Sequence, residues 1–126
     1  MNASLILRIF SEATKIVKQW AKRRAIYHFN FGYLNGISIM IMVAKVMHLM
    51  AQNGTLTLDN ASMTIQSIVE MFFSTYAAWA WSSTDVHKRT IFLPSIANPE
   101  DLPWSALSNC VMPIVCPYPP YKCTTL

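Results

Sequence analysis

The sequence has 126 residues, which is enough for one domain with a buried core but too few for two. Three cysteines, odd in number and without CxxC spacing, argue against a disulfide framework or a zinc site and for reduced intracellular thiols. Hydrophobic residues make up 53 % of the chain, but the most apolar windows are interrupted by Lys45 and Glu70, so we expect no membrane-spanning segment.

The positive charge is concentrated in the first part of the chain. The formal net charge is only +4, yet six of the ten lysines and arginines lie within the first 24 residues, and no acidic residue occurs between Glu12 and Asp59. Such a distribution creates a local positive field that suits phosphate-rich partners. An ordinary solvated basic helix face is the simpler alternative.

Residues 4–24 are predicted to form one amphipathic helix. Apolar residues recur there at intervals of three and four, at Leu5, Ile6, Ile9, Ala13, Ile16, Val17 and Trp20. On a helical wheel, four basic residues fall within about 80° of arc on the opposite side: Arg8, Lys15, Lys18 and Lys22. The helix is therefore predicted to have one face for the core and one cationic face.

Two more helices are predicted, over residues 34–52 and 61–81, with Asp59 or Asn60 as the N-cap of the latter. All seven prolines lie at or after Pro94, so residues 85–126 are expected to be mostly irregular. The predicted fold class is mainly α, a single domain formed by a bundle of about three long helices with an extended proline-rich C-terminal segment.

The sequence lacks the usual catalytic motifs. It has no phosphate-binding GxxxxGK loop, no HExxH or GxSxG motif, and no close pair of carboxylates able to hold a divalent metal. We therefore expect no catalytic residue and no metal ligand in this chain. What remains is a phosphate-binding and base-stacking surface, where lysines would contact phosphates and Tyr27 a phosphate or base. Simple packing roles for Tyr27 and Gly36 stay equally open.

Three segments resemble the central domain of eukaryotic-type poly(A) polymerases. "KQWAKRRAIY" followed by "GYLNGIS" is similar to that domain's Lys-x-Trp-Ala-Lys-Arg helix, its tyrosine and its Gly-Phe-Leu-Gly-Gly-Val-Ser segment. "FFSTYAAWAW" resembles its Phe-Phe helix ending in Trp-x-Trp, and "NPEDLPWSALSNCVMPIVCPYPP" resembles its Asn-Pro-x-Asp and Met-Pro-Ile stretch. The segments occur in the family's order and together cover most of the chain.

The resemblance implies a role in nucleotide binding. In that family the nucleotide lies between an N-terminal nucleotidyltransferase domain and the helical central domain, which a C-terminal RNA-binding domain follows. By resemblance, Lys18 and Tyr27 contact the triphosphate of ATP, and Gly36 and Ile37 lie near the adenine. A more general attraction for RNA or phosphate is expected of three other basic residues: Lys15, Lys22 and Arg23.

The implied parent reaction is transfer of AMP from ATP to an RNA 3′ end, in nuclear mRNA polyadenylation. Its Mg²⁺ or Mn²⁺ would be bound by aspartates of the catalytic domain, which are absent from this sequence, so the chain alone is expected to be inactive. The expected partners are the RNA 3′ end, ATP and the two neighbouring domains of the parent protein, with no membrane.

Some positions depart from the family pattern. Phe29 occupies a position where the family usually has an asparagine that contacts the nucleotide, and Asn35 replaces the first glycine of the Gly-Gly pair. These departures concern base selectivity, so a terminal uridylyltransferase is one alternative. A non-catalytic RNA-binding or interaction module is another. The last alternative is an amphipathic membrane-surface helix over residues 4–24.

Overall fold

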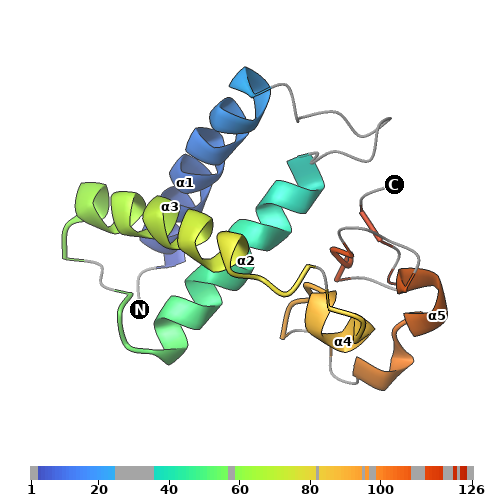
Figure 1. Cartoon of the computed structure of the whole chain (residues 1–126). Helices are drawn as coiled ribbons and strands as arrows, with labels where there is room; N and C mark the ends of the chain where they lie inside the picture. Colours follow the sequence, from blue (N-terminus) through green and yellow to red (C-terminus); the bar gives the residue numbers. More distant parts are fainter. Residues whose placement is uncertain are drawn as a thin grey trace.

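Three long helices, α1 (Ala3–Arg23), α2 (Gly36–Gln52) and α3 (Ala61–Ala77), form the body of the molecule, and each contacts the other two (Figure 1). This arrangement confirms the mainly helical fold predicted from the sequence. The computed structural model describes residues 3–24, 36–56, 59–81, 83–94, 96, 99–108, 113–117, 121 and 123–124. The predicted start of the second helix, at residue 34, lies outside these residues.

The three helices bury apolar residues against one another. In α1 the fully buried positions are spaced by four residues, one helical turn: Ile9, Ala13, Val17 and Ala21. In α2 buried residues occur on several faces, because α1, α3 and the C-terminal segment all surround it. Ile16, expected on the core face of α1, is instead 46 % exposed.

Aromatic side chains join α3 to the other two helices. The Phe73 ring packs edge-on against Trp20 of α1, with ring centroids 4.8 Å apart. Phe72 packs in the same manner against Phe73 and Tyr76, at 5.3 and 4.9 Å. The Tyr76 hydroxyl donates a hydrogen bond of 2.6 Å to the carbonyl of Met42 in α2. Burial raises the pKa of Tyr76 well above its ordinary value, so this hydroxyl keeps its proton.

Both ends of α3 have identifiable causes. The Asn60 side chain accepts a hydrogen bond of 3.2 Å from the amide of Met63, which caps the first turn. The helix ends at Ala77, earlier than residue 81 predicted from the sequence. The Trp81 indole turns back and donates to the Tyr76 carbonyl at 2.8 Å, a carbonyl that a continuing helix would bond through the amide of Ala80.

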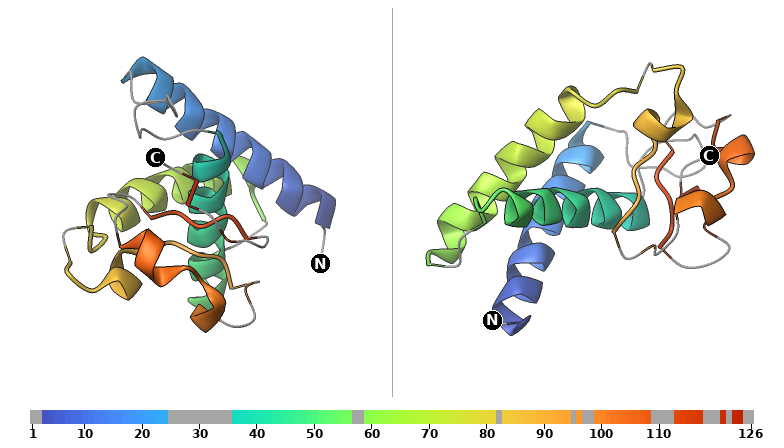
Figure 2. Two further views of the ribbon diagram at one scale, coloured as in Figure 1. Left: turned by 90° about the vertical axis from the view of Figure 1, so that its right-hand side faces the viewer. Right: turned by 90° about the horizontal axis from the view of Figure 1, so that it is seen from below.

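The C-terminal segment gathers at one end of the three-helix body, beside α2 (Figures 1 and 2). Its described residues include the short helices α4 (Val86–Arg89), η2 (Pro99–Asp101) and α5 (Trp104–Leu107), within a region expected to be mostly irregular. Two isolated β-bridges pair Ile91 with Ile114 and Val115 with Cys123. Ile91 and Ile114 are fully buried in the same core cluster as the three long helices, so this segment is part of the fold.

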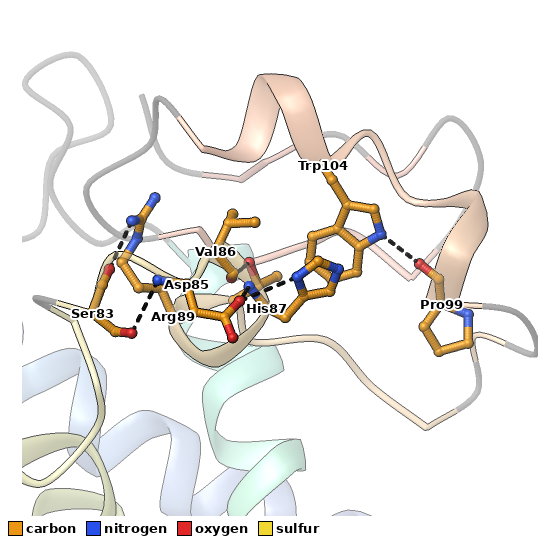
Figure 3. Close-up of polar contacts among 8 residues, drawn as sticks. Ser83, Asp85, Val86, His87, Arg89, Pro99 and Trp104 are labelled. Atoms are coloured by element: carbon orange, nitrogen blue, oxygen red, sulfur yellow. Dashed lines mark hydrogen bonds and ion pairs between the residues drawn. The ribbon is translucent and has the colours of Figure 1, made fainter.

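A ring contact and a hydrogen bond hold α4 against α5, and Figure 3 shows the His87 ring beside Trp104. The Arg89 guanidinium donates to the carbonyls of Ser83 and Ser108, both at 2.9 Å. The His87 ring lies over Trp104 with centroids 4.0 Å apart, and the Trp104 indole donates to the Pro99 carbonyl at 3.0 Å. A second small core, formed by Ile96, Leu102, Leu107 and Val115, packs against Trp104.

Asp85 makes the stability of this region depend on pH. Its carboxylate accepts hydrogen bonds from the His87 amide at 3.0 Å and the His87 ring at 3.2 Å, and these contacts lower the pKa of Asp85 below its ordinary 3.8. A lowered folded-state pKa contributes stability above the ordinary value, which is lost as the pH falls through the folded-state value. We expect Asp85→Ala to lower the melting temperature at neutral pH and to have a smaller effect near about pH 2. An equal effect at both pH values would contradict this assignment.

Candidate functional site

Basic side chains line a hollow on the second half of α1. The hollow has a volume of about 490 Å³ and is lined by Lys15, Lys18, Gln19, Lys22 and Arg23. We call it the cationic hollow. Lys15, Lys18 and Lys22 are spaced by three and four positions on one helix, so their side chains share a face, and Arg23 lies at its edge. The structure thus brings together four of the residues singled out in the sequence, including Lys18, one of the two expected to contact a triphosphate.

One lysine of this hollow is paired with an acidic neighbour. Lys15 forms an exposed ion pair of 3.4 Å with Glu12, one turn earlier in α1. Exposed pairs of this kind contribute about 0–1 kcal/mol, so a multivalent anion can readily compete with Glu12 for the Lys15 ammonium. The hollow therefore suits the clustered oxygens of a polyphosphate.

A second depression adjoins the cationic hollow. It has a volume of about 310 Å³ and is lined by Leu7, Phe10, Ser11, Thr14, Lys15, Lys18 and Met40. We call it the apolar groove. Thr14 donates its hydroxyl to the Phe10 carbonyl at 2.7 Å, so that hydroxyl is bonded within the helix. Lys15 and Lys18 line both depressions, which makes them the border between a charged and an apolar surface.

The apolar groove connects α1 with the first turns of α2. Met40 lies three residues after Ile37, so both side chains are on the same face of α2. Ile37 is 60 % exposed and Met40 is 46 % exposed, which leaves apolar surface available to a ligand or to another domain. A single ligand that contacts Lys18 can therefore extend towards the first turn of α2.

The other predicted site residues do not line either depression or lie outside the described residues. Gly36 and Ile37 form the start of α2, but neither lines the cationic hollow or the apolar groove. Tyr27 lies outside the described residues, as do the departures Phe29 and Asn35. Leu7, Phe10 and Met40 were not singled out from the sequence, where they looked like ordinary apolar positions of two helices.

Two basic residues outside the hollow, Lys45 and Arg89, contact other parts of the fold. Lys45, in the middle of α2, lies 5.6 Å from the centre of the Phe92 ring, and burial lowers its pKa. Arg89 bonds backbone carbonyls. Among the described residues, no group of three or more His, Cys, Asp or Glu is placed to hold a metal ion. None of the described helices is both long and apolar enough to cross a membrane.

Comparison with known proteins identifies the family. Residues 9–126 match the family model described as "Poly(A) polymerase central domain". The chain belongs to this family. The match confirms the resemblance seen in the three sequence segments, and it includes the cationic hollow and the start of α2.

Relatives of this central domain are longer proteins named as poly(A) polymerases. The chain is 38 % identical over 77 residues to "Poly(A) polymerase" of Entamoeba histolytica, a match that covers 61 % of this chain and 13 % of the relative. It is 30 % identical over 120 residues to "Poly(A) polymerase PAPalpha" of Candida albicans, a match that covers 93 % of this chain and 19 % of the relative. It is 32 % identical over 75 residues to "Nuclear poly(A) polymerase 3" of Arabidopsis thaliana, a match that covers 60 % of this chain and 13 % of the relative.

The central domain thus spans less than a fifth of the length of these relatives. No solved structure matches the chain at a significant level.

Proposed function

We propose that this central domain forms one wall of the nucleotide cleft of a poly(A) polymerase, where it holds the triphosphate and the adenine of ATP during template-independent addition of AMP to RNA 3′ ends. The observation that carries the proposal is the position of Lys18, on the border between the cationic hollow and the apolar groove. A nucleoside triphosphate has the matching shape, with charge at one end and a flat base at the other.

Each part of this surface has a role in the proposal. Lys18 binds the triphosphate, and Tyr27 assists it from the segment between α1 and α2. The flanking cations attract phosphate groups of ATP or of the RNA: Lys15, Lys22 and Arg23. Gly36 lets the backbone approach the adenine because it has no Cβ, and Ile37 offers its exposed side chain to the base.

The chemical step is assigned to another part of the parent protein. Transfer of AMP needs carboxylates that hold Mg²⁺ or Mn²⁺, and the described residues of this chain contain no set that fits such an ion. The central domain contributes to catalysis by placing the nucleotide and by neutralising its charge. The catalytic domain, the RNA-binding domain and the RNA 3′ end are its partners in this proposal, and the nucleus is its location, in line with the name of the Arabidopsis relative.

Replacing Lys18 with alanine tests the proposal. We expect Lys18→Ala to lower kcat/KM for ATP by about tenfold to hundredfold, the range for a lost charge-assisted hydrogen bond. The measurement is extension of a short RNA by the complete protein that contains this chain, with ATP and Mg²⁺ or Mn²⁺. Lys88→Ala, which removes an exposed lysine from α4, is the matched control and should have no effect.

Other outcomes would point to other functions. Activity of Lys18→Ala equal to that of the wild type would show that the cationic face does not bind the nucleotide. A preference for UTP over ATP would indicate a terminal uridylyltransferase. RNA binding that weakens steeply with salt and ignores added nucleotide would indicate a non-catalytic RNA-binding module.

A further inference from the structure

One hydrogen bond ties the first turn of α2 to the end of the described chain. The hydroxyl oxygens of Ser38 and Thr124 lie 2.7 Å apart, and Ser38 donates, because the Thr124 hydroxyl gives its one proton to the Ile114 carbonyl. Ser38 is completely buried, and the two residues are 86 positions apart in the sequence. Leaving a buried hydroxyl without such a partner costs free energy of folding, so the contact stabilises the observed position of this turn.

The Thr124 side of this contact is supported by buried backbone. Its hydroxyl and its amide both donate to the Ile114 carbonyl, each at 2.8 Å. Ile114 is itself bridged to Ile91, where the Ile91 amide donates to the Pro113 carbonyl at 2.8 Å and the Val115 amide donates to the Ile91 carbonyl at 2.9 Å. Thr124 is therefore held by a paired part of the C-terminal segment.

Ser38 directly follows the two residues proposed to face the base. Successive helical residues differ by about 100°, so Ser38 anchors the buried side of the turn that exposes Ile37. The lysines proposed to bind phosphate are on α1, a different element. A small displacement of the first turn of α2 would thus move the base contacts and leave the phosphate contacts in place.

From this geometry we infer that Ser38 and Thr124 are positioning residues that set the base selectivity of the nucleotide site. They hold Gly36 and Ile37 at the distance that fits adenine, while Lys18 binds the triphosphate of any nucleotide. The inference rests on the proposed function. It predicts that loss of either hydroxyl weakens discrimination between ATP and UTP, because misplacement of a binding group by as little as about 1 Å can be costly.

The test is titration of the complete protein that contains this chain with ATP, UTP and inorganic tripolyphosphate. We expect Ser38→Ala and Thr124→Val to reduce the ratio of UTP to ATP dissociation constants by about threefold to tenfold, the equivalent of one hydrogen bond. Binding of tripolyphosphate should be unchanged. Thr124→Ser keeps the hydroxyl and should keep the wild-type ratio.

A matched control separates selectivity from general loosening of the fold. Thr64 is a buried threonine of α3 whose hydroxyl donates to the Asn60 carbonyl at 2.9 Å, so Thr64→Val removes a comparable hydrogen bond elsewhere. An equal loss of selectivity in Thr64→Val would overturn the inference. A wild-type ratio in both Ser38→Ala and Thr124→Val, with binding of ATP intact, would overturn the inference alone. Absence of ATP and tripolyphosphate binding in the wild type would overturn the proposed function and the inference together.

Discussion

Replacing Phe72 with alanine is expected to lower the free energy of unfolding by about 3–5 kcal/mol, the usual cost of removing a phenylalanine ring from a core. Phe72 is only 2 % exposed and touches the rings of Phe73 and Tyr76 on its own helix. Through Phe73 the cluster reaches Trp20 of α1, and through Tyr76 it reaches Met42 of α2. Its loss would leave a cavity where the three long helices meet.

Equilibrium unfolding in urea measures this effect. Met71→Ala is the matched control, because Met71 is the preceding residue on the same helix and is partly exposed to solvent. We expect the control to cost about 1 kcal/mol or less. A similarly small loss for Phe72→Ala would show that the aromatic cluster does not hold the helices together.

The second large effect is expected at Ile114. Ile114→Ala should lower the free energy of unfolding by about 2–5 kcal/mol, because this side chain is fully buried in the core cluster of the three helices. It also pairs with Ile91, so the two residues attach the C-terminal segment to the helical body. If the segment were only loosely associated, the same change would have little effect.

Thermal unfolding together with limited proteolysis distinguishes these two cases. Ile16→Ala makes the same chemical change at a partly exposed position of α1 and should cost about 1 kcal/mol or less. We expect Ile114→Ala to speed cleavage within residues 83–117, whereas Ile16→Ala should leave the cleavage rate unchanged. Equal stability of the two variants would contradict an integrated C-terminal segment.

The helical body and its charged face could be predicted from the sequence because both depend on local spacing. Ile9, Ala13 and Val17 recur at helical intervals, and the cations fall on the other side of the same helix. Lys18 was placed on that face from its position alone, and the structure brings it together with Lys15 and Lys22.

Features that join distant parts of the chain could not be predicted in this way. The bridge between Ile91 and Ile114 depends on tertiary packing, so no local pattern shows which residue Ile114 pairs with. The apolar groove arises where Phe10 and Met40, from two helices, lie close together. The sequence prediction placed the end of α3 too late. The Trp81 indole takes the Tyr76 carbonyl that a longer helix would need, and periodic spacing does not reveal such a contact.

The contact between Ser38 and Thr124 also bears on the order of folding. Contacts between residues far apart in sequence form late, because closing a long loop costs entropy before the contact contributes stability. During synthesis the three long helices emerge first and can pack on one another before Thr124 leaves the ribosome. The proposed phosphate-binding lysines would then be in place in the nascent chain before the turn proposed to face the base is fixed.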